Sequence, residues 1–117
     1  MVKLYERHCE PCGLGASVVT REEGDQLMIA IPAWHREFHD GMEKLIRTFH
    51  FVGFKEAFNF TYKVAALAEQ EDHHPGIFTE WGKVTVYWWT HKINGLHVND
   101  FIMAAKTDII AKSIESS

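Results

Sequence analysis

The feature that most constrains the fold is residues 54–73, where apolar residues recur at helical spacing on two adjacent faces. One face holds Phe54, Phe58, Thr61, Ala65 and Ala68, and the other holds Phe60, Val64 and Leu67. An apolar surface this wide buries more than one side of a helix. We therefore expect this helix to pack both on its own sheet and on a partner chain. Pro75 ends the helix, because the residue before a proline is disfavoured in helical geometry.

Two hairpins are predicted on either side of this helix. Asp40-Gly41 is a turn signal between two apolar runs, residues 33–39 and 42–51. Residues 76–81 and 83–91 surround a second turn at Gly82, and the run 83–91 alternates strictly between its two faces. Such alternation of β-branched and aromatic residues is typical of a half-buried strand.

Two further helices complete the pattern. Thr20 and Glu23 form a capping box that begins the first, and Pro32 stops it. The last runs over about residues 97–112, and His97 stands where a Ser or Thr cap is usual, so we expect this helix to start less firmly. The order α-β-β-α-β-β-α predicts an α+β fold: a four-stranded antiparallel sheet with three helices packed on one face.

The chain has 117 residues, enough for one domain. We assign residues 1–18 to a flexible N-terminal segment that carries a CxxC motif. Residues 19–112 form the single domain, and residues 113–117 are expected to fray.

Composition excludes several function classes. The formal net charge of −4 provides no basic field that would attract nucleic acid. The sequence contains no run of about 18 apolar residues, the length that a membrane-spanning helix requires. The first residues lack the apolar core of a secretory signal, and two cysteines do not make a disulfide framework. These features predict a cytoplasmic protein.

The CxxC motif, Cys9 to Cys12, has two interpretations. With His8 beside it, the pair could be half of a zinc site, which would need two more ligands. The alternative is a solvated dithiol on a flexible tail. A redox role has less support, because no βαβ pattern surrounds the pair. We predict no metal and no cofactor.

The candidate catalytic residues are histidines with nearby acids. Glu69 lies four residues before His73, which places both on one face at the end of the predicted helix. A carboxylate beside an imidazole orients the ring and favours its protonated form. His91 ends the last predicted strand, and Asp100, at the start of the last helix, could reach it and fix its tautomer. Paired histidines before a proline could equally cap a helix end.

The same residues carry a family resemblance that covers residues 9–112. Glu69, His73-His74-Pro75, Trp81, His91 and Asp100 stand at the spacing found in pterin-4a-carbinolamine dehydratases. The surrounding pairs are similar too: Ala68-Glu69, Lys83-Val84, Thr90-His91 and Gly95-Leu96. The sequence therefore resembles this family over most of its length.

The resemblance implies a hydro-lyase that converts 4a-hydroxytetrahydrobiopterin, or a related pterin, to the quinonoid dihydropterin and water. Such an enzyme supports tetrahydropterin recycling beside an aromatic amino acid hydroxylase, by general acid–base chemistry without a metal or redox cofactor. It implies His73 and His91 as the acid–base pair and His74 as a catalytic and pterin-orienting residue. The other implied site residues are Glu69 and Asp100 as supporting acids, with Trp81 and Thr90 in substrate binding.

The sequence departs from the family pattern near the candidate site, and two alternative functions remain. Gly76-Ile77 stand where family members often have Glu-Trp, and we expect this change to affect substrate affinity. A first alternative is a dimerisation or binding module, as in mammalian members that assist a homeodomain transcription factor. A second is a dehydratase-like protein that acts on another pterin, for example in molybdopterin metabolism. By resemblance, we expect a homodimer or homotetramer.

Overall fold

The computed structural model describes residues 3–10, 17–93 and 95–115, and it has the expected α-β-β-α-β-β-α order. The helices and strands are α1 (Arg21–Met28), β1 (His35–His39), β2 (Met42–His50), α2 (Phe54–Glu71), β3 (Gly76–Glu80), β4 (Lys83–Trp88) and α3 (Val98–Glu115). Two short 3₁₀ turns, η1 (Leu4–Glu6) and η2 (His91–Ile93), lie outside this series. The predicted fold class is confirmed.

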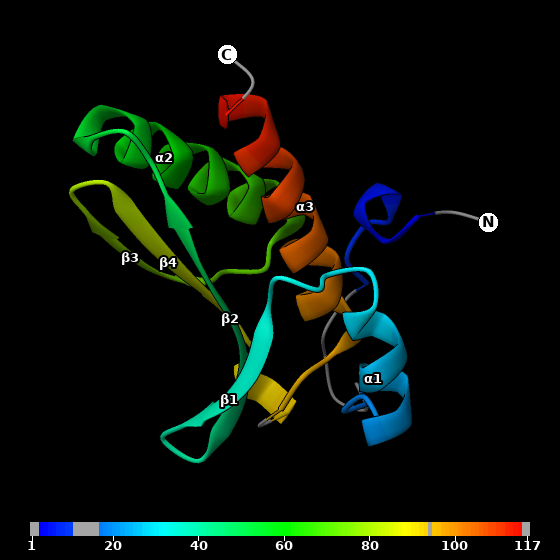
Figure 1. Ribbon diagram of the computed structural model, residues 1–117. Helices are drawn as coiled ribbons and strands as arrows, with labels where there is room; N and C mark the ends of the chain where they lie inside the picture. The colour runs from blue at the N-terminus through cyan, green and yellow to red at the C-terminus, as the bar shows by residue number, and fades with distance from the viewer. Residues whose placement is uncertain (1–2, 11–16, 94, 116–117) are drawn as a thin grey trace.

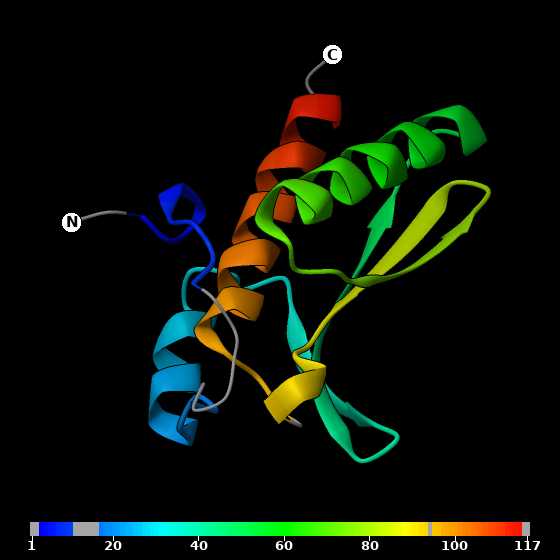
Figure 2. The same cartoon turned by 180° about the vertical axis from the view of Figure 1, so that it is seen from behind.

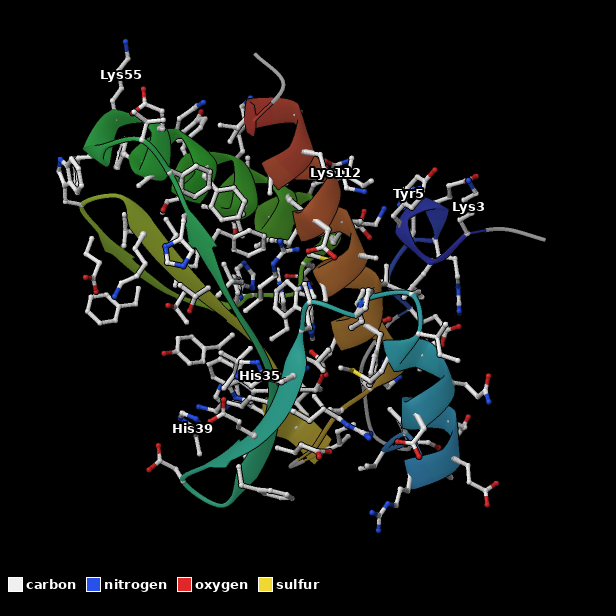
Figure 3. The ribbon with its side chains drawn as sticks, in the orientation of Figure 1. Lys3, Tyr5, His35, His39, Lys55 and Lys112 are labelled. Carbon is white, nitrogen blue, oxygen red and sulfur yellow. The ribbon has the colours of Figure 1, made fainter. Side chains whose placement is uncertain are left out.

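The four strands form one antiparallel sheet in the order β1-β2-β4-β3, so β2 and β4 are central. Helices α2 and α3 pack against each other and lie over the same side of the sheet, as Figure 1 shows. The reverse view in Figure 2 shows α1 on the other side of α3 from α2. His35 and His39, labelled in Figure 3, mark β1, one of the two edge strands of the sheet.

The core lies between the sheet and the two long helices. On β4 the alternation is confirmed, with Val84, Val86 and Trp88 fully buried. On α2 the buried residues are Ala57, Phe60, Val64 and Ala68, which recur at helical spacing. The first expectation for this helix, packing on its own sheet, is therefore confirmed.

The first hairpin turn and the first helix cap form as the sequence predicts. Asp40 and Gly41 both have positive φ, 56° and 78°, which is the geometry of a two-residue hairpin turn. The Thr20 hydroxyl accepts a hydrogen bond from the Glu23 amide at 3.1 Å, and the Glu23 carboxylate accepts one from the Thr20 amide at 2.9 Å. This is the complete capping box.

The expectation of a loosely started last helix is wrong. The ring Nδ1 of His97 accepts a hydrogen bond from the Asn99 amide at 3.0 Å, and Asp100 Oδ2 accepts one from the His97 amide at 2.9 Å. An imidazole nitrogen without its proton is an acceptor, so it satisfies a free amide of the first turn as a hydroxyl would. His97 therefore caps α3 well, with Asp100 as its reciprocal partner.

Two predicted elements end earlier than expected, and both ends lie at the candidate site. Helix α2 stops at Glu71, because Asp72 adopts the left-handed conformation with φ of 53°. Strand β4 stops at Trp88. Beyond it Thr90 makes an isolated bridge to Gly95, and His91 lies in η2. His73 and His91 are therefore both held in connecting segments, outside the regular elements predicted for them.

Residues 3–10, part of the segment assigned as flexible, lie against α3. The contact includes a hydrogen bond from the Lys106 ammonium to the Tyr5 carbonyl at 3.2 Å. Lys3 and Tyr5 are labelled in Figure 3 on this segment. Cys12 lies outside the described residues. Within the described ranges, none of the helices combines the length and apolarity that crossing a membrane requires.

Asp108 of α3 joins two parts of the core, and its loss is expected to destabilise the protein. Its Oδ1 accepts hydrogen bonds from Trp34 Nε1 at 2.8 Å and from the Arg47 guanidinium at 2.6 Å. Asp108→Ala leaves both donors without this acceptor, and we expect the free energy of unfolding to fall by about 1–3 kcal/mol. Urea denaturation at neutral pH measures it.

Asp108→Asn is the matched variant, and it should lose less stability than the alanine. Burial raises the pKa of Asp108 against the opposing influence of Trp34 and Arg47. The folded protein therefore binds this proton more tightly than the unfolded chain, and the contribution of Asp108 to stability falls as pH rises from the ordinary carboxyl range. Asparagine keeps an acceptor for Trp34 and removes this pH dependence. Equal losses in the two variants would contradict this account.

Candidate active site

The centre of the candidate site is a buried pair, His73 and Asp100. The His73 Nε2 atom lies 2.6 Å from Asp100 Oδ1. The other carboxylate oxygen of Asp100 accepts hydrogen bonds from the Thr90 hydroxyl at 2.8 Å and from the His97 amide at 2.9 Å. Asp100 is fully buried, and a buried carboxylate requires such partners. Three donors thus fix its position at the start of α3.

This pairing determines which nitrogen of His73 is available for chemistry. A carboxylate accepts from the Nε2–H, so the neutral ring has its acceptor at Nδ1. The ring also stacks on Trp88, with centroids 5.8 Å apart and planes within 8°. His73 is therefore held in one tautomer and one orientation, as a proton-transfer group requires.

His74 and Glu69 form a second pair nearer to solvent. His74 Nε2 and Glu69 Oε2 are in hydrogen-bond contact, and their side chains are 56% and 78% exposed. Exposed ion pairs add little to stability. The contact is therefore better understood as a constraint on the orientation of the His74 ring.

His91 is oriented by Trp89, two residues earlier in the chain. Trp89 Nε1 donates a hydrogen bond to His91 Nδ1 at 3.1 Å. In the neutral ring this places the proton on Nε2, so that Nε2–H is a donor. The Lys44 ammonium lies over the Trp89 ring, 4.1 Å from its centroid. This cation–π contact restrains the orientation of the indole.

The structure corrects the predicted partners of these histidines. The sequence spacing paired Glu69 with His73 and Asp100 with His91, whereas Asp100 contacts His73 and Glu69 contacts His74. The four-residue spacing applies only inside a helix. Because α2 ends at Glu71 and the chain reverses direction at Asp72, His73 leaves the helix surface and points to α3.

A cleft of about 420 Å³ brings His73, His74, Thr90 and His91 together. This volume suits a small bicyclic ligand. Asp100 and Glu69 do not line the cleft but support residues that do. Trp81, predicted to bind substrate, lies outside the cleft with 72% of its surface exposed, in the turn between β3 and β4.

Seven further residues line this cleft that were not among the predicted site residues: Cys9, Glu10, Glu71, Asp72, Trp89, Lys92 and Asn99. Glu71 and Asn99 stand one or two positions from the predicted residues, and Cys9 and Glu10 come from the N-terminal segment. No local pattern marks Asn99, and Glu71 is one of several acids in its stretch of sequence. Among the residues that the structure describes, no cluster of three or more His, Cys, Asp or Glu side chains is arranged to hold a metal ion.

Comparison with known proteins agrees with this fold. The family model described as pterin 4 alpha carbinolamine dehydratase matches residues 17–110. A crystal structure of a transcriptional coactivator/pterin dehydratase from Brucella melitensis is 36% identical in sequence, with a TM-score of 0.74. The match covers 81% of this chain and 99% of that one. The chain belongs to the pterin-4a-carbinolamine dehydratase family.

Proposed function

We propose that this protein dehydrates a 4a-hydroxytetrahydropterin to the quinonoid dihydropterin and water, and so supports tetrahydropterin recycling. The observation that carries the proposal is the buried His73–Asp100 pair at a cleft that also contains His74 and His91. Family membership supports the same reaction class, that of a hydro-lyase.

The reaction needs one proton removed and one delivered. The N5–H bond of the pterin breaks, its electron pair forms the C4a=N5 double bond, and the C4a–O bond releases hydroxide. We assign the N5 proton to His73 Nδ1, because Asp100 on the other nitrogen stabilises the imidazolium that forms. His91 Nε2–H donates a hydrogen bond to the leaving oxygen and keeps its proton, so that it stabilises the developing charge. The proton taken by His73 then passes to the hydroxide, which leaves as water.

The remaining site residues bind or position. His74, at the exposed rim and oriented by Glu69, would contact the pterin. Thr90 lines the cleft, but its hydroxyl donates to Asp100, so we assign it a positioning role as well as substrate contact. No step in this mechanism uses a metal or a redox cofactor.

The decisive experiment is a coupled assay. The purified protein is added to a phenylalanine hydroxylase reaction, and the absorbance of the 4a-carbinolamine is followed. The proposal predicts faster decay with the wild-type protein and no acceleration with the His73→Ala/His91→Ala double variant. A folded wild-type protein that leaves the decay unchanged would contradict the proposal and favour another pterin or a binding role.

The outer face of α2 supports the proposal of a homodimer or homotetramer. Phe54, Phe58 and Tyr62 follow one another at four-residue spacing and are 51%, 58% and 66% exposed. Phe58 and Tyr62, with Phe51 and Ile114, line a broad groove. Lys55, which lines the same groove, is labelled in Figure 3. Exposed aromatic patches of this kind mark protein interaction sites.

Sedimentation equilibrium tests this assembly. We expect the wild-type protein to have the mass of a dimer or tetramer and Phe58→Glu to shift it toward the monomer, because a charge in an apolar interface is costly. Lys63→Glu, on an exposed position of the same helix, is the matched control and should leave the mass unchanged. A wild-type monomer at micromolar concentration would contradict the proposal.

A further inference from the structure

The N-terminal segment reaches the candidate active site. Cys9 and Glu10 line the same cleft as His73 and His74, although they are more than sixty residues away in the sequence. The family match begins only at residue 17, so it does not include them. Residues 8–10 are called here the N-terminal strap.

The first attachment of the strap is Glu71, the last residue of α2. Its Oε1 accepts a hydrogen bond from the Cys9 amide at 2.8 Å, and its Oε2 lies 2.9 Å from His8 Nδ1. The Glu71 side chain is only 6% exposed. Both carboxylate oxygens therefore contact the strap.

The charge on Glu71 makes this attachment strong. Burial acts to raise the pKa of Glu71, but the Cys9 amide, His8 and Lys106 outweigh it and hold the pKa below its ordinary value. Glu71 is therefore ionised at neutral pH. Hydrogen bonds to an ionised acceptor are about twice as strong as neutral ones.

The second attachment is Asn99, in the first turn of α3. Its side-chain oxygen accepts a hydrogen bond from the Glu10 amide at 2.8 Å, and its side-chain nitrogen donates to the Glu10 carbonyl at 2.6 Å. This amide thus pairs with both backbone groups of one residue, as a neighbouring strand would. Asn99 is 1% exposed, so the pairing is shielded from water.

Both attachments are adjacent to the proposed catalytic residues. Glu71 precedes His73 by two positions, and Asn99 directly precedes Asp100. The strap is thus fixed to the same two segments that carry the His73–Asp100 pair.

We propose that the N-terminal strap forms a wall of the pterin cleft and determines substrate affinity, with Glu71 and Asn99 as its positioning residues. This inference rests on the proposed function, because it assigns the same cleft to a pterin. A wall that contacts the ground state and transition state alike lowers KM without changing kcat. The strap contributes no group to proton transfer.

The kinetic test compares two replacements of Glu71. Glu71→Ala removes both acceptors of the strap. Because the free energy of about one charged hydrogen bond is lost, we expect KM to rise about tenfold while kcat stays within about twofold of wild type. Glu71→Gln keeps one oxygen for the Cys9 amide and should restore most of the affinity. Glu22→Ala, an exposed acid in α1, is the control. A lower kcat at unchanged KM, or no change in either, would overturn the proposal.

A second test does not depend on turnover. In a Cys12→Ser background, alkylation of Cys9 by iodoacetamide is followed by mass spectrometry with and without 7,8-dihydrobiopterin. Bound pterin should slow alkylation about tenfold, and this protection should disappear in the added Glu71→Ala variant.

The two tests separate this inference from the proposed function. Protection of Cys9 by the pterin in a protein without dehydratase activity would support the strap and contradict the reaction. Dehydratase activity without protection of Cys9 would contradict the proposed role of the strap as a wall of the cleft and leave the reaction supported.

Discussion

Replacing His73 by alanine is expected to lower the kcat for carbinolamine dehydration by about a hundredfold or more, the usual range for loss of a general acid–base group. The reason is geometric. Asp100 fixes the proton on Nε2, so Nδ1 is the acceptor that the N5 proton of the pterin would meet. The measurement is the coupled assay at saturating substrate, with circular dichroism to confirm the fold.

Two controls separate proton transfer from packing, because the His73 ring also stacks on Trp88. External imidazole should restore part of the rate of His73→Ala, which a purely structural defect would not allow. His50→Ala, at an exposed position of β2 outside the cleft, should behave as wild type. Retention of most of the wild-type kcat in His73→Ala would place the proton transfer elsewhere.

Much of the fold follows from the sequence, because its signals are local. The alternation in β4 places Val84 and Val86 in the core, and the Asp40-Gly41 turn needs only the positive φ that these residue types tolerate. The capping box at Thr20 is equally local. The turn and the capping box satisfy their hydrogen bonds within a few residues. Strand β4 pairs with the distant β2, but its alternation alone indicates which side chains are buried.

The histidines could be found from the sequence, but their partners could not. The pairing of Glu69 with His73 assumed that the helix continues, whereas the left-handed residue Asp72 ends it. The identity of Asp72 alone does not require this, although aspartate adopts the left-handed conformation more readily than most residues. The contact of His73 with Asp100 spans 27 residues and arises only when α3 packs against the end of α2.

The strap illustrates the same limit more strongly. A carboxylate at Glu71 and an amide at Asn99 look like ordinary surface residues in the sequence. They become attachments only because residues 8–10 lie against the ends of α2 and α3, a contact made over 62 and 89 residues of chain. Tertiary hydrogen bonds of this kind leave no periodic or local signal.

Asp100→Asn is expected to lower kcat by about a hundredfold or more while it changes the side chain by a single group. Asp100 accepts from three donors: the His73 ring, the Thr90 hydroxyl and the His97 amide. An amide has only one accepting oxygen, so its NH₂ must face one of these donors. If it faces His73, the ring changes tautomer and Nδ1 no longer accepts a proton. If it faces the Thr90 hydroxyl and the His97 amide, these two donors lose their acceptor, and the cap of α3 loses the contact from Asp100.

Stability and tautomer measurements test this explanation. The free energy of unfolding of Asp100→Asn should fall by about 1–3 kcal/mol, because a buried donor loses its partner. Nitrogen NMR should show the His73 proton on Nε2 in the wild type and on Nδ1 in the variant. Thr90→Val removes one donor and keeps the contact between Asp100 and His73. It should lower the free energy of unfolding by about the value of one neutral hydrogen bond and keep kcat within a few-fold of wild type. An Asp100→Asn protein with wild-type kcat would show that Asp100 serves only to hold α3, and that His73 needs no carboxylate to transfer a proton.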